Sequence, residues 1–253
     1  MSLDPRDESL MTAFPYPEPG PRQNRLLAEL PEAEWQRWQA QLEAVDLRLG
    51  QVLCGSGSEP EYAYFPASAI VSLVYMTQDG ASNEIAVVGN EGVVGISLFM
   101  GGIATPSEAV VQSAGLAYRL RAQIVTKEAL RAGPVLSVLL RYTDSLIAQV
   151  AQTAACNRYH SVDQLLCRRL LMGLDRAPSG DIVMTQELAS SLLGVRREGV
   201  TAAATRLQQA GVIRYSRGRI AVLDRERLEQ LTCEFHAGTK KEHTLPVPMA
   251  AVI

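Results

Sequence analysis

The stretch TQELASSLLGVRREGVTAAATRL, residues 185–207, decides how the C-terminal part of the chain folds. Apolar residues recur at helical spacing on both sides of Gly194, and the small Ser190 lies where two steeply crossing helices would meet. The turn between such helices needs a residue that accepts a positive φ, which glycine does without steric cost. The stretch therefore predicts a helix-turn-helix, with a plain helical hairpin as the alternative. The apolar positions are Ala189, Leu193, Val195, Val200 and Ala203.

The second helix of this pair is expected to begin with Arg196, Arg197 and Glu198. In a helix-turn-helix the start of the second helix meets the base edges of the major groove. Polar and basic side chains around it are candidates for contacts with DNA phosphates. For two of them, Arg206 and Arg217, a solvated charge is nearly as good an interpretation. The phosphate candidates are Thr185, Gln186, Thr201, Arg206 and Arg217.

Charge is unevenly distributed along the 253 residues. The whole chain has a formal net charge of −3, but residues 181–225 carry seven arginines against four acidic residues. A local basic patch is what contact with nucleic-acid phosphates requires. This region is therefore expected to face DNA, although the chain as a whole is slightly acidic.

Other function classes fit the composition poorly. No apolar run has the length needed to span a bilayer, and no secretory signal pattern is visible at the N-terminus, so no contact with a membrane is expected. The four cysteines are widely spaced, which favours reduced thiols in the cytoplasm. The sequence has three histidines and no nucleophile, metal-ligand or Walker-type motif. We therefore expect a cytoplasmic protein that is not an enzyme.

The N-terminal half predicts β-structure preceded by a flexible arm. Residues 1–23 contain five prolines and little periodicity, and residues 24–133 are expected to form a β-roll sensor domain. Two short helices, at 25–30 and 32–42, should precede the strands. The expected strands are 48–53, 62–65, 69–76, 83–88, 108–113 and 115–120.

A long helix is predicted over residues 134–159, after a short one at 123–132. Its apolar positions form a nearly continuous seam, which favours pairing with the same helix of a second copy. The alternative is that the β-roll covers this seam. The seam residues are Leu136, Leu139, Leu140, Thr143, Leu146, Ile147, Val150 and Ala154.

Residues 160–236 predict a winged helix-turn-helix domain. A helix over 161–175 should bury its leucines and expose Arg168 and Arg169. Segments 212–215 and 219–223 alternate like a β-hairpin, the wing. A last helix should start after Asp224 and run to about Phe235, and residues 237–253 are expected to be a flexible tail. The fold class is thus α+β.

The order of β-roll, long helix and winged helix resembles the Crp/Fnr family of bacterial transcription regulators, which includes the cyclic-AMP receptor protein. Three stretches carry the resemblance: Tyr64-Phe65-Pro66, residues 89–95 leading to Leu98-Phe99, and residues 193–198. The resemblance implies a homodimer that binds a pseudo-palindromic duplex site near a promoter and, in an activator, contacts RNA polymerase. It also makes Arg197 and Glu198 base-reading residues.

The resemblance breaks down at the cyclic-nucleotide site. Family members that bind cyclic AMP offer a Gly-Glu pair to the ribose and an Arg-Ser/Thr-Ala triplet to the phosphate. Here Gly95 is followed by Ile96 and Ser97, and the triplet position reads Ser107-Glu108-Ala109. Loss of a charge-assisted arginine–phosphate pair, with a carboxylate nearby, predicts no tight binding of cyclic AMP. The possible ligand pocket comprises Val94, Gly95, Ile96, Ser97, Ser107 and Glu108.

The family's other sensors and its second DNA-reading arginine are also missing. No cysteine precedes Cys54 to bind an iron–sulfur cluster, and the roll has no histidine for haem, so no cofactor and no metal are expected. His160 at the hinge is expected to be a structural residue rather than a pH sensor, and Cys156 and Cys167 leave a redox role open. Ala202 stands where the family has its second arginine, so Arg196 is the candidate to replace part of that contact.

The sequence thus predicts a homodimeric, sequence-specific DNA-binding transcription regulator that cyclic AMP does not control. The alternative is a ligand-dependent regulator whose β-roll binds an unidentified small molecule, or an atypical cyclic nucleotide, to switch DNA binding. The two differ in whether DNA binding changes with a ligand.

Overall fold

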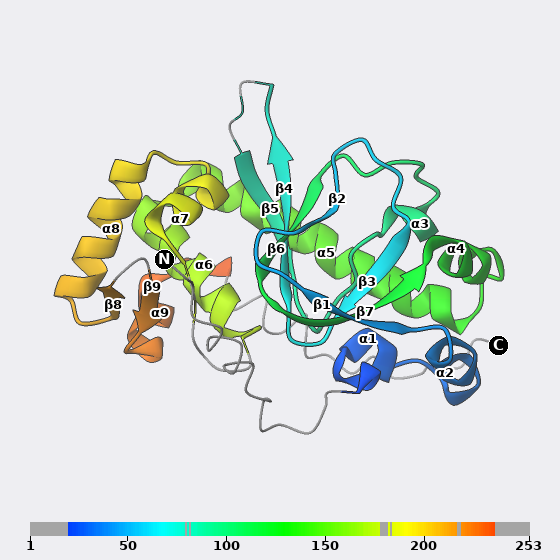
Figure 1. Ribbon diagram of the computed structural model, residues 1–253. Helices are drawn as coiled ribbons and strands as arrows, with labels where there is room; N and C mark the ends of the chain where they lie inside the picture. Colours follow the sequence, from blue (N-terminus) through cyan, green and yellow to red (C-terminus); the bar gives the residue numbers. More distant parts are fainter. Residues whose placement is uncertain are drawn as a thin grey trace, which may run out of the picture.

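The computed structural model describes residues 20–78, 80, 82–177, 182, 184–216 and 219–235. Residues 1–19 of the predicted arm 1–23, the predicted tail 237–253 and Arg217 therefore lie outside the described residues. Figure 1 shows two parts, a β-sandwich on one side and a group of short helices on the other, with helix α5 (Pro134–Tyr159) running behind the strands into the helical part. No helix in the described ranges is both long and apolar enough to cross a membrane.

The sandwich consists of two antiparallel sheets. One has the strand order β1-β7-β3 and the other β2-β6-β4-β5. The first sheet contains β1 (Glu43–Leu47), β3 (Tyr62–Pro66) and β7 (Gly115–Arg121). The second contains β2 (Val52–Cys54), β4 (Ile70–Met76), β5 (Ser82–Val88) and β6 (Glu108–Ser113).

The sequence located most strands of the sandwich but misplaced the first. A strand was expected over 48–53, whereas β1 ends at Leu47 and β2 begins at Val52. Gly50 lies between them with a φ of 77°, which turns the chain from one sheet to the other. Along Glu43–Leu47 the half-buried first position is a glutamate and the exposed second position an alanine, so apolar and polar residues alternate too weakly to mark a strand.

Short helices close the ends of the sandwich. They are α1 (Arg25–Ala28), α2 (Glu32–Gln39), α3 (Ser97–Met100) and α4 (Ala122–Leu130), with a 3₁₀ turn at Pro21–Gln23. Asn24 is fully buried; its Oδ1 accepts from Leu27 N, and its Nδ2 donates to Pro66 O and Gly92 O. This residue therefore attaches the N-terminal helices to the sandwich.

Helix α5 packs against the sandwich through one face. Tyr142 lies against Gly92, where an added Cβ would come within 2.5 Å of the tyrosine ring. Gln149 exchanges hydrogen bonds with the backbone of Val87 in β5. A side chain larger than hydrogen at position 92 would thus force the Tyr142 ring out of its place.

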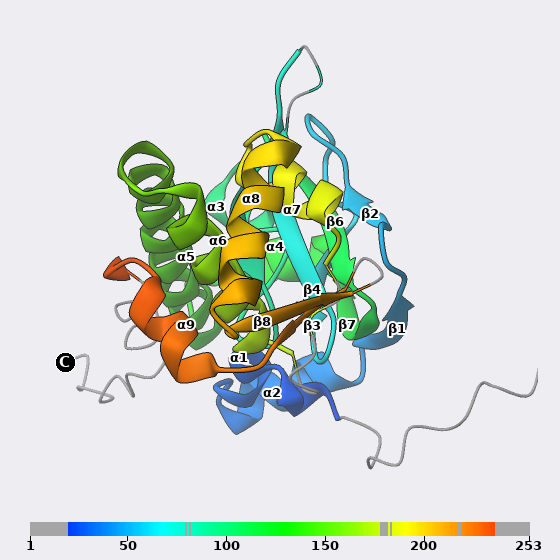
Figure 2. The ribbon, with the colours of Figure 1, turned by 90° about the vertical axis from the view of Figure 1, so that its left-hand side faces the viewer.

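The C-terminal part is a winged helix-turn-helix. It contains α6 (Val162–Leu174), α7 (Gln186–Leu193), α8 (Arg197–Gln209), the hairpin β8 (Ile213–Ser216) with β9 (Arg219–Val222), and α9 (Arg225–Leu231). Its core is a separate apolar cluster that includes Leu166, Leu170, Val200 and Ile220. In Figure 2 the hairpin crosses beside one end of α8, in the position of a wing.

Candidate functional site

Helices α7 and α8 form the predicted helix-turn-helix. Gly194 ends α7 with a φ of 63°, the left-handed conformation expected of it. The Thr185 hydroxyl caps α7 by accepting from Leu188 N, and the Thr201 hydroxyl donates to Gln186 Oε1 at 2.8 Å. That bond joins the start of α7 to the first turns of α8 and fixes their crossing.

The start of α8 is an open, polar surface. Arg196 is the N-cap residue of α8, and Arg197 and Glu198 are its first two residues. All three side chains are exposed, and none makes a hydrogen bond or ion pair within the described ranges. Helix α8 lies on the outside of the molecule, on the far side of α7 from the sandwich (Figure 1). This surface is therefore free to meet a large partner.

The candidate phosphate contacts are not equally free. Arg206 donates from Nε and Nη2 to both carboxylate oxygens of Asp163, at 2.8 and 2.6 Å. Arg206 is therefore already paired with a carboxylate, and this ion pair links α8 to α6. Thr185 and Thr201 also use their hydroxyls within the fold.

Two arginines of α6 overturn an expectation. Arg168 and Arg169 were predicted to face solvent, but only 6% and 4% of their surface is exposed. Arg169 Nε lies 2.7 Å from Glu84 Oε1 on β5, and Gln112 accepts from the same guanidinium. Arg168 Nη1 donates to Thr153 Oγ1 of α5 at 3.4 Å. Because α5 and the sandwich pack on this side of α6, the positions that a lone helix would expose become buried.

A second buried ion pair joins the two parts of the chain. Arg176 Nε, just after α6, lies 2.6 Å from Glu91 Oε1 in the sandwich. Burial raises the pKa of the Glu84 carboxyl, and the charges of Arg169 and Arg176 oppose that rise. The helix-turn-helix also touches the sandwich directly, because Ser82 Oγ donates to Ser191 O. Met172 of α6 also packs against Ile70 and Val87 of the sandwich, so polar and apolar contacts together set the orientation of the helix-turn-helix domain.

The seam of α5 is divided between two environments. Leu139, Thr143 and Leu146 are buried within the chain itself, and Leu136 and Val150 are half-buried against the core of the sandwich. The expectation that these residues form the surface of a dimer seam is therefore corrected: the sandwich covers most of the seam. Ile147 and Leu140 are 59% and 43% exposed, and Ala151 and Ala154 are exposed beside them.

The suggested ligand pocket lies where the chain leaves the sandwich for α3. Val94 is buried and bridges to Tyr64, Gly95 has a φ of 104°, and Ile96 precedes the first residue of α3, Ser97. Ser97 Oγ is buried and has no hydrogen-bond partner within the described ranges. Ser107 is buried, and Glu108 begins β6 opposite Val74.

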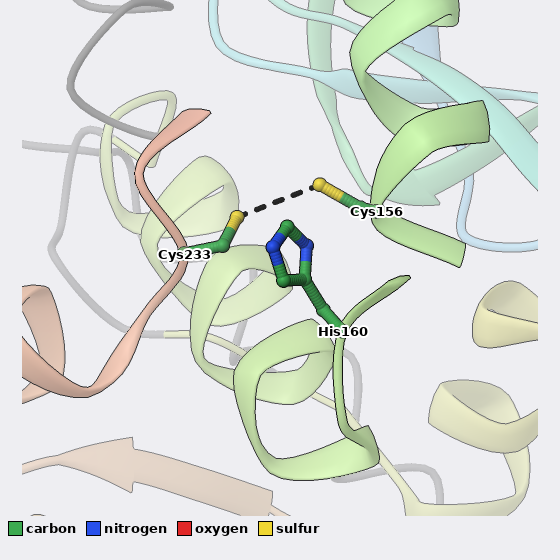
Figure 3. A group of neighbouring side chains, drawn as sticks. All are labelled: Cys156, His160 and Cys233. Atoms are coloured by element: carbon green, nitrogen blue, oxygen red, sulfur yellow. Dashed lines mark hydrogen bonds between the residues drawn. The ribbon is translucent and has the colours of Figure 1, made fainter. Parts of the chain in front are cut away.

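The hinge between α5 and α6 brings together side chains that the sequence separates. Cys156 of α5, His160 and Cys233 lie side by side in Figure 3, with 3.5 Å between the two sulfur atoms. The hydrogen bond between the Cys156 and Cys233 sulfurs is the largest influence that lowers the pKa of Cys233. Cys167 is not part of this group; burial raises its pKa to about 12.

Sequence reasoning missed Glu84, Glu91 and Cys233. Glu84 and Arg169 are 85 positions apart in the chain. Nothing in the sequence around an acidic residue of a strand indicates so distant an ion-pair partner. A weak signal was present: two successive arginines, 168 and 169, interrupt the leucines of α6. The position of Cys233 near the hinge was missed because α9 was expected to continue to about Phe235, whereas it ends at Leu231.

Two family models match the chain. A cyclic nucleotide-binding domain matches residues 44–130, and a Crp-like helix-turn-helix domain matches residues 164–231. Together they cover more than half of the chain. No match was found among curated proteins.

Solved structures share the fold at low sequence identity. FixK2 from Bradyrhizobium japonicum is 18% identical with a TM-score of 0.64, and the match covers 76% of this chain and 98% of that one. The c-di-GMP responsive regulator CLP from Xanthomonas campestris is 14% identical with a TM-score of 0.61, covering 76% and 99%. A Crp/Fnr-family regulator from Eubacterium rectale is 18% identical with a TM-score of 0.61, covering 83% and 98%. The two domain matches, in this order and joined by a long helix, show that the chain belongs to the Crp/Fnr family of transcription regulators.

Proposed function

We propose that this protein acts as a homodimer and reads a pseudo-palindromic DNA site through the start of α8, without control by cyclic AMP. One observation carries the proposal: Arg196, Arg197 and Glu198 are exposed and unengaged at the N-terminus of α8. Arginine pairs bidentately with guanine, and glutamate accepts from cytosine N4. The end of a helix that enters the major groove is where such side chains reach base edges.

The side chains at and around the start of α8 support two proposed kinds of DNA contact, to bases and to phosphates. Arg197 and Glu198 would read bases, while the hydroxyls of Thr185 and Thr201, the Gln186 amide and Arg206 would face phosphates. Arg206 would contact a phosphate only by sharing its guanidinium with Asp163. Ala202 is exposed on α8 and offers only a methyl group, so the half-site should differ from one read by a second arginine.

Dimerisation is proposed through the exposed face of α5. Leu140, Ile147, Ala151 and Ala154 follow a spacing of three, four and seven residues, which places them on one side of the helix. Large exposed apolar side chains on a long helix favour an isologous contact with a second copy. Such a dimer would place two α8 helices for half-sites about one turn of DNA apart.

Independence from cyclic AMP rests on charge. No arginine or lysine lies between Gly89 and Gln112. Ser107 stands at the position of the phosphate-binding arginine, and Glu108 follows it directly. A carboxylate there would repel a cyclic phosphate instead of pairing with it.

The test combines calorimetry with DNA binding. Cyclic AMP titrated into the full chain is expected to give no saturable heat, and the anisotropy of a labelled operator duplex should titrate identically with and without it. Saturation at micromolar cyclic AMP would contradict the proposal.

A second candidate is a regulator whose roll binds another small molecule. It is favoured by Ser97 Oγ, a buried hydroxyl without a partner within the described ranges, beside the positive-φ Gly95. A buried hydroxyl that is left unpaired costs free energy that a ligand could recover. This candidate requires that some compound change the affinity for DNA, which a screen by anisotropy would reveal.

A further inference from the structure

The hinge between the long helix and the DNA-binding domain gathers three side chains of metal-binding type. Cys156 comes from the last turn of α5, His160 from the link to α6, and Cys233 from the segment after α9. One ligand atom from each of the three lies within 4.8 Å of the others. Figure 3 shows the imidazole of His160 beside both sulfur atoms. Residues from three separate segments thus meet at one point.

The spacing of the sulfurs fits a shared metal ion. They are 3.5 Å apart. Two thiolates bound to a tetrahedral Zn²⁺ at about 2.3 Å each would lie about 3.8 Å apart. A disulfide would need about 2.0 Å. Small movements of two side chains would therefore complete the zinc geometry.

The histidine is oriented as a metal ligand would be. His160 Nε2 lies 3.3 Å from Glu234 Oε2, while its Nδ1 is buried and has no hydrogen-bond partner within the described ranges. A carboxylate that accepts from one ring nitrogen fixes the tautomer and leaves a lone pair on the other. The imidazole side chain is 10% exposed, so water does not easily satisfy that nitrogen.

The surroundings suit a closed site for a soft cation. Phe235 packs edge-on against the His160 ring at 5.8 Å, and Leu165 and Leu193 cover the sulfurs. Arg168 is buried nearby, and its Nε and Nη2 have no hydrogen-bond partner within the described ranges. Two thiolates would neutralise the charge of a divalent cation.

We propose that Cys156, His160 and Cys233 form a binding site for a thiophilic divalent cation, best matched by Zn²⁺. The two thiols release their protons on binding, and His160 binds through the nitrogen that Glu234 does not hold. A water molecule completes the four ligands. The sequence alone predicted no metal, because Cys233 lies 77 positions from Cys156.

Metal binding here would join the end of α5 to the end of α9. Leu193, the last residue of α7, packs against this cluster, directly before the turn at Gly194. Occupancy would therefore hold the helix-turn-helix in a fixed orientation relative to the long helix. This consequence rests on the proposed DNA-binding function, whereas the metal site does not.

The test uses cobalt as a spectroscopic probe. The full chain, reduced and freed of metal with a chelator, is titrated with Co²⁺. One equivalent should produce sulfur-to-cobalt charge-transfer absorption and tetrahedral d–d bands, and Zn²⁺ should abolish both. Cys156→Ser, Cys233→Ser and His160→Gln should lose or weaken them. Cys54→Ser, which changes a half-buried cysteine in the sandwich, should keep the full signal.

A further variant separates ligand from orienting residue. Glu234→Gln should keep a thiolate spectrum but bind Co²⁺ about 10- to 100-fold more weakly, as expected for a carboxylate that orients a histidine ligand. If a variant does not fold, X-ray absorption of the zinc-loaded wild type should still show two sulfur ligands and one nitrogen ligand.

Several outcomes would overturn the site. They are the absence of charge-transfer absorption in the wild type, an unchanged spectrum in Cys156→Ser, or a chain that is two hydrogen masses lighter without reductant and holds no metal. The last result would assign the pair to a disulfide. DNA affinity is measured separately with and without Zn²⁺, so a failure of the DNA-binding proposal leaves the cobalt result standing.

Discussion

Arg169 of α6 and Glu84 of β5 form a buried ion pair that links the DNA-binding domain to the sandwich, with Nε and Oε1 2.7 Å apart. Ser72 and Gln112 surround the pair as hydrogen-bond partners. Buried charges are tolerated only when they are paired in this way. Helix α6 belongs to the same domain as α8, and β5 belongs to the sandwich, so the pair lies between the proposed DNA-reading surface and the proposed sensor domain.

The first prediction concerns this ion pair. Glu84→Gln should lower the free energy of unfolding by about 3–5 kcal/mol, because it leaves the guanidinium of Arg169 buried and unpaired. Urea unfolding followed by circular dichroism measures the change. Glu29→Gln is the control, since it breaks an exposed pair with Arg141 and should cost at most about 1 kcal/mol. Equal effects of the two variants would contradict the buried pairing.

The second prediction concerns DNA reading. Arg197→Ala should weaken binding to the preferred site by about 1–3 kcal/mol and relax preference at one base position in each half-site. Arg206→Ala should weaken preferred and random duplexes alike, because a phosphate contact carries no sequence information. Fluorescence anisotropy on both kinds of duplex measures this. Equal losses for Arg197→Ala on both would refute direct base reading.

The third prediction concerns the dimer. Leu140→Asp combined with Ile147→Asp should give a folded monomer, since both side chains lie on the exposed face of α5. Leu146→Asp should instead reduce stability, because Leu146 is buried within the chain. Sedimentation equilibrium gives the mass, and thermal unfolding gives the stability. A dimer that survives the double substitution would place the interface elsewhere.

The fourth prediction concerns cysteine reactivity. Cys167 should resist alkylation in the folded protein near pH 8, because burial keeps its pKa near 12 and the thiolate is the reactive form. Mass spectrometry after iodoacetamide treatment and digestion measures the labelling of each thiol. The unfolded chain is the control and should label fully at this position. Rapid labelling of native Cys167 would show that its helix opens readily.

The sequence predicted local structure well where the residues of a single segment determine its backbone conformation. Gly194 locates the turn of the helix-turn-helix, and Pro134 locates the start of α5. Both depend on backbone requirements of single residues. The strand Glu43–Leu47 was missed because its alternation is weak.

Contacts between distant segments could not be predicted. The burial of Arg169 depends on a carboxylate in β5, and the position of Cys233 depends on where α9 ends. Likewise, the apolar residues of the α5 seam recur at one helical spacing, but some of them face the sandwich and others face solvent. Only the folded structure shows that Leu146 is buried in the core and that Ile147 is exposed. Spacing along a helix gives the angle between side chains, not the identity of what lies opposite.

The most direct test of the proposed function is selection of bound sequences from random duplex DNA by the purified full chain, at a stated salt concentration and without cyclic AMP. The account predicts recovery of a two-fold-symmetric site whose half-sites lie about one DNA turn apart. It also predicts that Arg197→Ala loses preference at one position of each half-site. Failure to enrich any site, or enrichment of a single asymmetric site, would contradict it.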